Sequence, residues 1–467
     1  MKTTNYILFT ILFFTLSLFT SCKKDYFSNS KIAYFGGEVI NPTSRFVLFC
    51  KDNEVIDTIS LKTDNTFFKK FDSLTPGLYS FKHNPEYQYV YFEKNDSIMV
   101  HIDANNFDES IVFCGKGAEK NNFLMEMYLK NEKDKNKMFP IFESNFTVFN
   151  NQNDKLNSEN QKIYKLKKNQ IDWSSDFDLY ARCVVDFPYF TKKEMYPSVH
   201  KLRTGKEIES KIAKDYYCFR KDIDLNATKL IHFSPYINYI NQMLTNICFD
   251  KKTPNLSEAG IALQNNINKL KLTDSLIKNE EIKNVVLNNI AFYYLLEDQN
   301  MINNQAFIET FHHFSTDKSH KNEITNLGNA IQLLTIGKFL PEIKLIDENG
   351  KMENSDKLIS GKTIVFFWTE SLNSHFEGVH KKAMELQKKH PDYKFIAINI
   401  DTNPYKWKTI LMNYKFSTIK EYHCVNFEDL KNKWAITKIH RTIIINSDKT
   451  IKNAFTNMFD ANFENQL

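Results

Sequence analysis

The stretch from Gly361 to Glu377 constrains the fold more than any other part of this chain. It contains a short apolar run, Ile364 to Trp368, whose length and composition predict a buried strand. After a polar interval, apolar residues recur at helical spacing, and His390-Pro391 ends a pattern formed by Phe376, Val379, Ala383 and Leu386. A strand, a loop and a helix in this order are typical of α/β proteins, which place ligands at the carboxyl ends of their strands.

Further landmarks surround this stretch in a fixed order. Two more central strands are predicted at Phe395 to Ile400 and Thr442 to Ile445. The landmarks are Gly337 to Glu342, the turn Asp347 to Lys351, Gly361-Lys362, Ile398 to Asp401, and Ile443 to Lys449. Together they resemble the thioredoxin superfamily and, within it, the membrane-anchored TlpA-type thiol-disulfide oxidoreductases. The resemblance covers Gly337 to about Asn453, and it implies an α/β thioredoxin-like domain, which we place at residues 335–467.

The resemblance implies a Cys-x-x-Cys motif after the tryptophan-bearing strand, because a thiolate at a helix N-terminus has a lowered pKa. One register places Ser371 and Ser374 at the two cysteine positions, and the register shifted by one residue places Leu372 and His375 there. The degenerate redox loop, formed by Ser371, Leu372, Asn373, Ser374 and His375, supplies no thiol in either register. We therefore predict a retained fold without redox catalysis at this loop, and no catalytic residue in it.

The second landmark that the resemblance implies is a cis-proline facing the redox loop, and His440 occupies the matching position, followed by Arg441. A cis bond before a residue other than proline costs about 2.5 to 4 kcal/mol, so we expect a trans loop of different shape. The fold would bring His375 close to His440. Two imidazoles alone make a poor metal site, so we predict neither a metal nor another cofactor.

The N-terminus reads as an export signal. Met1 to Ser21 carries an early lysine and the apolar run Tyr6 to Phe19, which is too short for a membrane span. The ending Leu18 to Cys22 resembles a bacterial lipobox, which implies that Cys22 carries a lipid anchor that holds the chain to the membrane. An ordinary cleaved signal with an incidental Cys22 is the alternative. The lipid reading predicts an outer-membrane lipoprotein in a Gram-negative cell envelope, facing either the periplasm or the surface.

After a linker at residues 22–30, residues 31–116 alternate as strands do. Seven runs separated by turn residues predict an antiparallel β-sandwich: Arg45 to Cys50, Val55 to Leu61, Thr66 to Phe71, Leu78 to Lys82, Gln88 to Phe92, Ile98 to Ile102 and Ile111 to Phe113. This stretch resembles the β domain often joined to thioredoxin-like domains in envelope lipoproteins. Its aromatics Tyr87, Tyr89, Tyr91 and Phe92 form either a ligand platform or two sets divided between the core and a half-covered outer face.

Residues 117–334 change to helical periodicity and predict a mainly α-helical domain. The helices expected are Asn122 to Leu129, Tyr236 to Leu244, Glu258 to Leu270, Glu280 to Glu297, Gln305 to Phe314 and Ile324 to Leu334. The segment Asn145 to Glu159 is rich in Asn, Asp and Ser and is expected to be a loop. His312, His313 and His320 lack the spacing of a metal site and are assigned to a solvated helix face.

Composition limits the partners. A net charge of +5 on 467 residues, with acids interleaved among the lysines, predicts no nucleic-acid partner. Besides Cys22, the chain has Cys50, Cys114, Cys183, Cys218, Cys248 and Cys424, which lie far apart without motif spacing. Buried free thiols are the favoured interpretation, and disulfides in an oxidising envelope are the alternative.

These observations favour a non-catalytic binding or assembly role at the membrane. In this hypothesis the loop at Ser371 to His375 and the facing His440 and Arg441 recognise a protein or peptide partner. The alternative is thiol-disulfide exchange in cell redox homeostasis, as in TlpA-type relatives, carried by a non-standard cysteine such as Cys424.

Overall fold

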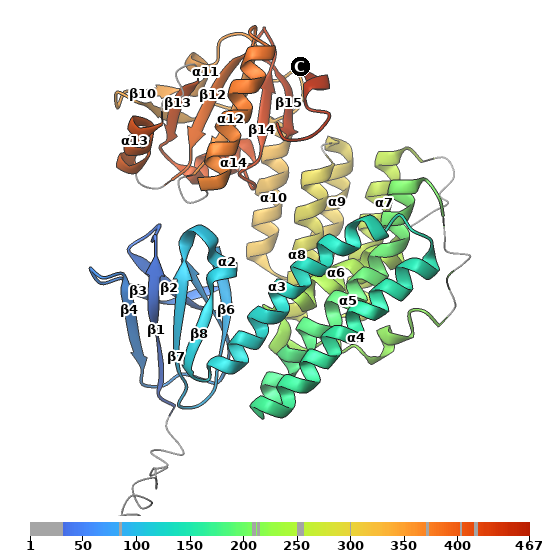
Figure 1. The fold of residues 1–467 in the computed structure, drawn as a ribbon. Coiled ribbons are helices and arrows are strands. Elements are labelled where there is room, and N and C mark those ends of the chain that lie inside the picture. The colour runs from blue at the N-terminus through green and yellow to red at the C-terminus, as the bar shows by residue number, and fades with distance from the viewer. Residues whose placement is uncertain are drawn as a thin grey trace, which may run out of the picture.

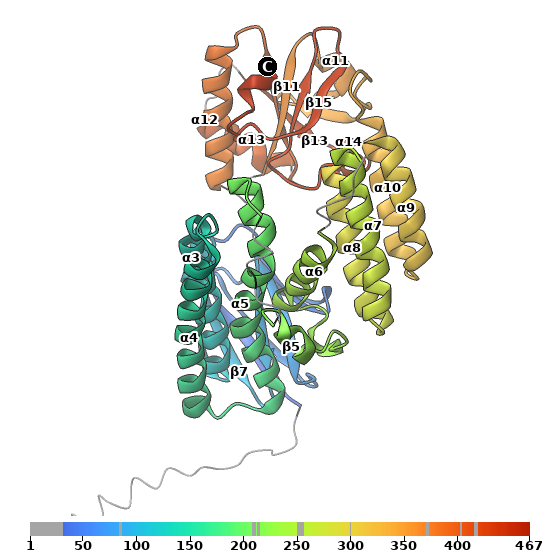
Figure 2. The same cartoon turned by 90° about the vertical axis from the view of Figure 1, so that its right-hand side faces the viewer.

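The computed structural model describes residues 31–83, 86–207, 212, 215–249, 256–298, 300–369, 373–401, 404–414 and 419–467. The predictions for Cys22, Ser371 and Leu372 lie outside these residues. An N-terminal sheet domain, a helical middle and a C-terminal α/β region follow one another along the chain. In Figure 1 the sheet domain (blue) and the α/β region (orange to red) both adjoin the helical middle (teal to yellow). Figure 2 shows α10 directly beneath the α/β region.

The N-terminal domain consists of two four-stranded sheets with the orders β4-β1-β7-β8 and β3-β2-β5-β6. Phenylalanines from both sheets, including Phe35, Phe49, Phe81 and Phe92, form one shared core. The short helix α2 (Phe107–Ser110) follows β7. The strands are β1 (Ala33–Ile40), β2 (Phe46–Lys51), β3 (Glu54–Ser60), β4 (Thr66–Phe71), β5 (Gly77–His83), β6 (Glu86–Phe92), β7 (Ser97–Asp103) and β8 (Val112–Lys116).

The expectation of a wholly antiparallel arrangement was wrong, because β1 pairs with β7 in parallel. The sequence pattern also missed β1 itself, since Gly36-Gly37 looks like a turn. These glycines instead permit close approach between strands: a Cβ at Gly37 would lie 2.0 Å from the carbonyl oxygen of Val100. Only glycine fits so near a neighbouring backbone.

The helical middle contains eight long helices within the described residues. Helix α8 has the bounds that the periodicity predicted, and the Asn279 side chain caps it by accepting a hydrogen bond from the amide of Ile282 at 3.0 Å. The helices are α3 (Ala118–Ile141), α4 (Phe146–Ile171), α5 (Ser175–Thr204), α6 (Ser234–Cys248), α7 (Glu258–Leu276), α8 (Glu280–Glu297), α9 (Met301–Phe314) and α10 (Lys318–Leu333).

The segment Asn145 to Glu159, predicted as a loop, is the first half of α4. Asn145 caps this helix, and its side chain accepts a hydrogen bond from the amide of Val148 at 3.1 Å. Buried residues then recur every three or four positions, but two of them are the asparagines Asn153 and Asn160. Asn153 donates to the carbonyl of Tyr189 on α5 at 3.3 Å, so polar residues stand where the sequence pattern required apolar ones. The same polarity hid the helical stripe from the prediction.

The C-terminal region is built on a seven-stranded sheet with the order β10-β9-β13-β12-β11-β14-β15. Its central strand β11 is buried along its whole length and pairs in parallel with β12 and antiparallel with β14. The strands are β9 (Lys344–Asp347), β10 (Met352–Asn354), β11 (Thr363–Trp368), β12 (Lys394–Asn399), β13 (Lys420–Cys424), β14 (Thr442–Ile445) and β15 (Ile451–Thr456).

Helices cover both faces of this sheet. On one face α12 (Asn373–Lys389) and α13 (Pro404–Asn413) pack through Val379, Leu386 and Trp407. On the other face lies α14 (Phe427–Trp434), and α10 of the helical middle packs against α14. The small helix α11 (Ser355–Leu358) precedes β11.

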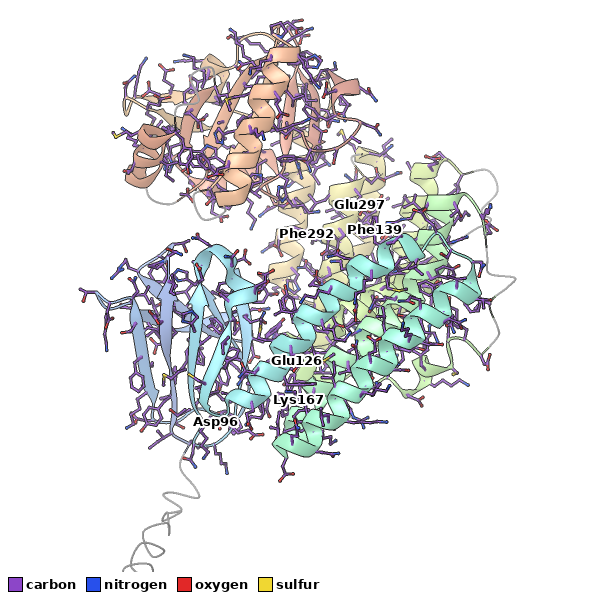
Figure 3. All side chains as sticks on the ribbon, in the orientation of Figure 1. Asp96, Glu126, Phe139, Lys167, Phe292 and Glu297 are labelled. Carbon is purple, nitrogen blue, oxygen red and sulfur yellow. The ribbon has the colours of Figure 1, made fainter. Side chains whose placement is uncertain are left out.

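The helical middle also packs against the N-terminal sheets. The ring of Tyr91 on β6 lies 5.1 Å from that of Phe177 on α5, whereas Phe92 points into the core between the sheets. The aromatics of β6 are therefore divided between two faces, as one of the two predictions had it. Figure 3 labels Glu126 of α3 and Lys167 of α4, whose ion pair at 3.5 Å links the first two long helices. Within the described part of the chain, every helix is too short or too polar to cross a membrane.

Candidate functional site

The predicted loop lies where β11 gives way to α12. Strand β11 ends at Trp368 and α12 begins at Asn373, so His375 lies in the first turn of the helix. The His375 ring is 9% exposed, and its centroid lies 4.7 Å from that of His440. The fold thus brings His375 and His440 together as the sequence predicted. The side chains of Asn373 and Ser374 lie outside the described residues.

His375 is a buried imidazole without hydrogen bonds. Neither ring nitrogen has a hydrogen-bond partner within the described residues. Burial, helped by the nearby His440 and His380, lowers the pKa of His375 to about 4. At neutral pH the ring is therefore uncharged, and it holds one N–H donor and one lone-pair acceptor that no described side chain uses.

The two residues at the cis-proline position differ in exposure. His440 is exposed and covers His375 from the solvent side. Arg441 is 8% exposed; its guanidinium lies 4.4 Å from the centre of the Phe455 ring and donates to the carbonyl of Ala454 at 3.3 Å. Burial lowers the pKa of Arg441 to about 10. Arg441 therefore packs behind the loop against β15, and only His440 of the two is open to a partner.

A buried polar network that the sequence analysis missed lies beneath the loop. The Glu421 carboxylate on β13 accepts a hydrogen bond from Trp368 Nε1 at 3.1 Å and lies 2.9 Å from His380 Nε2. His380 Nδ1 lies 2.8 Å from the carbonyl oxygen of Phe376, one turn earlier in α12. His380 and Glu421 are 0% and 5% exposed. The position of His380 on the apolar stripe of α12 was the one signal in the sequence, because a histidine there needs a buried partner.

A second polar group lines the carboxyl ends of the parallel strands. Asp401 accepts hydrogen bonds from Thr369 after β11 and from Asn399 of β12, the latter at 2.6 Å. Asn399 in turn contacts His423 of β13 at 3.0 Å, and the His423 ring stacks on Trp407 with centroids 5.8 Å apart. Burial lowers the pKa of His423. The edge of the sheet beside the loop is thus held by hydrogen bonds between neighbouring strands.

The cysteines are placed away from this loop. Cys424 is buried on β13, and burial raises the pKa of its thiol to about 11. Because β12 lies between β11 and β13, Cys424 is separated from Trp368 by two strand spacings, about 10 Å. Among the described residues all six cysteines are free; Cys50 and Cys183 are also buried, Cys248 is half-buried, and Cys114 and Cys218 are exposed. The structure brings no described thiol to the loop.

The histidines do not form a larger metal site. In the part of the chain that the structure describes, no three His, Cys, Asp or Glu side chains gather around one point. His312 Nε2 instead lies 2.9 Å from the Thr325 hydroxyl, which joins α9 to α10.

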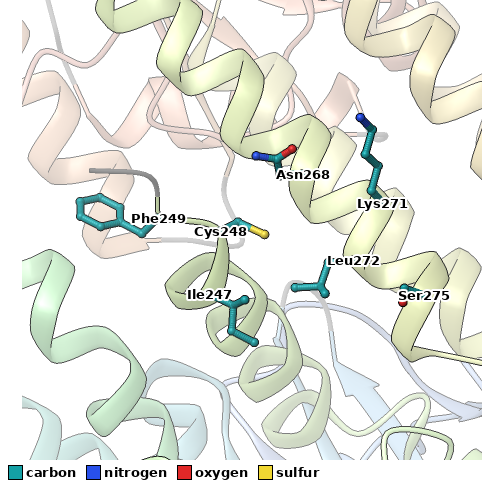
Figure 4. Close-up of a pocket in the computed structure, with 7 residues that line it drawn as sticks. All are labelled: Ile247, Cys248, Phe249, Asn268, Lys271, Leu272 and Ser275. Carbon is teal, nitrogen blue, oxygen red and sulfur yellow. The ribbon is translucent and has the colours of Figure 1, made fainter. Parts of the chain in front are cut away.

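Two cavities lie outside the α/β region. The larger, of about 620 Å³, lies between the end of α6 and the middle of α7 (Figure 4). Cys248, Asn268 and Lys271 line it. The other, of about 430 Å³, lies between β6 and helices α3, α5 and α6.

Comparison with known proteins assigns the fold of the C-terminal region. Residues 361–451 match the family model described as thioredoxin-like. No curated protein matches the sequence. The C-terminal α/β region is therefore a thioredoxin-like domain.

Several solved structures resemble less than a third of this chain. A protein from Bacteroides vulgatus described as a thiol-disulfide oxidoreductase is 20% identical; the match covers 29% of this chain and 95% of that one, with a TM-score of 0.26. A domain from Cytophaga hutchinsonii described as a thiol-disulfide isomerase is 19% identical over 28% of this chain and 90% of that one, with a TM-score of 0.25. A protein from Chlorobium tepidum described as a thiol:disulfide interchange protein is 12% identical, over 28% and 95% of the two chains, with a TM-score of 0.25.

Proposed function

We propose that this protein is a lipid-anchored envelope protein whose TlpA-type thioredoxin-like domain has a degenerate redox site and binds a protein or peptide partner without redox chemistry. The observation that carries the proposal is the contact between His375 and His440. The segment from Thr369 to Glu377, which includes His375, contains no cysteine. The contact favours the register in which His375 stands at the second cysteine position.

The chemistry of His375 supports recognition through hydrogen bonds. A buried polar atom without a partner costs about 1–3 kcal/mol, and a partner that hydrogen-bonds to it recovers that loss. His375 offers one donor and one acceptor at neutral pH, and the exposed His440 stands over it. A peptide backbone, which has both an N–H and a C=O, complements this pair of groups.

The same geometry argues against thiol chemistry. A nucleophilic cysteine needs an accessible thiolate with a lowered pKa, whereas burial raises the pKa of Cys424. Exchange through this thiol would require the interior strand β13, which pairs with β9 and β12, to become accessible. The alternative of a TlpA-type oxidoreductase therefore has no supporting residue in the described part of this domain.

Site-specific photocrosslinking in cells tests the binding proposal. A photoreactive phenylalanine analogue at position 440 is expected to give one discrete protein adduct, and the same analogue at Tyr293, a 55% exposed position on α8, serves as the matched control. The adduct from position 440 should weaken when His375 is also changed to Ala. Equal adducts from both positions, or none from position 440, would refute the proposal.

Insulin-disulfide reduction tests the loss of redox activity. The natural chain is expected to be silent, and a variant with Leu372→Cys, His375→Cys and His440→Pro is expected to gain activity. If the natural chain reduces insulin, a thiol that we regard as structural is catalytic.

The lipid anchor is tested separately through Cys22. We expect radioactive palmitate to label the natural chain and the chain to sediment with membranes. A Cys22→Ala variant should lose both properties, and labelling that survives this change would contradict the assignment.

A further inference from the structure

The cavity of about 430 Å³ lies where the N-terminal sheet domain meets the helical middle. Its walls come from β6, α3, α5 and α6, with Asp108 of α2 at one end. Figure 1 shows α3 running from the sheet domain along the helical middle, so one helix spans the length of this junction. Cavities of about 300–1,000 Å³ between domains are typical small-ligand sites. The function proposed for the thioredoxin-like domain does not use this cavity.

One end of the cavity is aromatic and acidic. The Tyr89 ring lies 5.8 Å from that of Tyr87 and 5.1 Å from that of Phe233. The Asp108 carboxylate accepts a hydrogen bond from the Tyr128 hydroxyl at 2.9 Å. Tyrosine faces beside a carboxylate attract a protonated amine through both the ring quadrupole and the full charge.

The acidic end lacks a positive charge of its own. Burial raises the pKa of Glu86, and the neighbouring Asp108 raises it further; burial also raises the pKa of Asp108. Among the residues that the structure describes, no lysine, arginine or histidine lies within ion-pairing distance of either carboxylate. A desolvated carboxylate without a counter-charge is unfavourable, and a ligand ammonium would supply one.

The rest of the cavity has an apolar wall and charges of both signs, because Glu132 also lines it and lies 3.6 Å from Lys135. Lys192 and Lys135 line it together with Met138, Phe142 and Met195. The Lys192 ammonium donates to the carbonyl of Pro188 at 3.1 Å, and burial lowers its pKa to about 8. Asp134 and Glu132 act on this pKa in the opposite direction, but Lys192 forms no ion pair within the described residues, and a ligand carboxylate would provide one.

Asn131 of α3 lies in the cavity wall between the two ends. Asn131 donates through Nδ2 to the carbonyl of Val184 at 2.8 Å, while its Oδ1 is buried without a hydrogen-bond partner.

The spacing of these groups sets the size of the ligand. Tyr128 at the acidic end and Lys135 toward the basic end are seven residues apart on α3, which is about 10 Å of helix. An extended chain covers this distance in about three residues. From the charges at the two ends and the distance between them we infer that the cavity binds a short peptide of about three residues with free termini. Its ammonium lies at Glu86 and Asp108, its carboxylate at Lys192, and its apolar side chains against the aromatic and methionine wall.

Calorimetric titration of the purified full chain with the tripeptide Leu-Phe-Leu tests this inference. We expect the free peptide to bind and its N-acetyl and C-amide forms to bind at least tenfold more weakly. Glu86→Gln should weaken the free peptide by a similar factor but leave the N-acetyl form nearly unchanged, and Lys192→Met should behave likewise toward the C-amide form. Glu281→Gln, at an exposed position on α8, is the matched control and should change nothing.

Three results would overturn the inference: no binding of the free peptide at millimolar concentration, equal binding of the N-acetyl form, or an unchanged affinity in Glu86→Gln. Tighter binding of the N-acetyl form would point to a neutral amphiphile instead. Because the crosslinking experiment probes the thioredoxin-like domain, failure here leaves that proposal standing, and the reverse also holds.

Discussion

Removing the carboxylate of Glu421 should destabilise the thioredoxin-like domain strongly. Because the Phe376 carbonyl only accepts hydrogen bonds, His380 Nδ1 must carry a proton, and a further proton lies between Nε2 and the carboxylate. The same carboxylate receives the indole N–H of Trp368. Glu421→Ala therefore leaves two buried groups without a partner at once.

The expected loss follows from those two groups. An unsatisfied buried group costs about 1–3 kcal/mol, and breaking a buried ion pair on one side costs about 3–5 kcal/mol. We therefore expect Glu421→Ala to lower the free energy of unfolding by about 3–5 kcal/mol. Glu385→Ala, at an exposed position on α12, is the control and should stay within about 0.5 kcal/mol of the natural chain.

Denaturation followed by tryptophan fluorescence measures this loss, because three of the four tryptophans, Trp368, Trp407 and Trp434, are buried in this domain. A double variant with His380→Leu and Glu421→Leu removes both members of the pair, so its loss should be smaller than the sum of the single losses. A loss below about 1 kcal/mol in Glu421→Ala, or additive losses in the double variant, would refute the network as a source of stability.

Three further predictions concern pH, thiol reactivity and backbone conformation. The pKa of His375 is lower in the folded protein than in the unfolded chain, so the unfolded chain binds more protons between about pH 6.5 and 4. The free energy of unfolding should therefore fall as pH falls through this window, and it should fall less in a His375→Gln variant. Denaturant midpoints measured across this pH range check the prediction. Iodoacetamide should modify the exposed Cys114 and spare the buried Cys424 until denaturant is added, and mass spectrometry of the labelled peptides will distinguish them. Gly115→Ala should lower the melting temperature more than Gly205→Ala. Both glycines have a positive φ, but only at Gly115 would an added Cβ meet a backbone atom, the carbonyl oxygen of Ser97, at 2.1 Å.

Much of the fold could be predicted because local signals agreed with the packing. Strand β4 and helix α8 have the predicted bounds: alternation marks the first, and an asparagine cap with a broad apolar face marks the second. Strand β1 and helix α4 were missed for the opposite reason. Their glycines and buried asparagines are chosen for contacts with distant segments, and single-sequence periodicity does not contain those contacts.

The candidate site was predicted where the family landmarks lie close together in sequence. The loop and the facing His440 were located from motif order, and their contact followed from the fold. The pair of His380 and Glu421 was not predicted. The two residues are 41 positions apart, and each alone looks like an ordinary polar residue in an apolar pattern. The exposure of Arg441 was likewise misjudged, since its long side chain turns back onto Phe455.

The residues of the loop and the residues that hold the fold of this domain are largely different. Strand β11 and the network around Glu421 lie below the loop and are buried, whereas His440 is exposed and makes its ring contact only with the neutral His375 within the described chain. His375 sits in the first turn of α12, where the helix dipole also disfavours a positive charge. Under the proposed function, changes at His440 are therefore expected to alter recognition without disturbing the core. A change at Arg441 does the opposite, since it removes a buried side chain that joins β14 to β15. The proposed recognition and the stability of the domain are thus expected to depend on two different, adjacent residues.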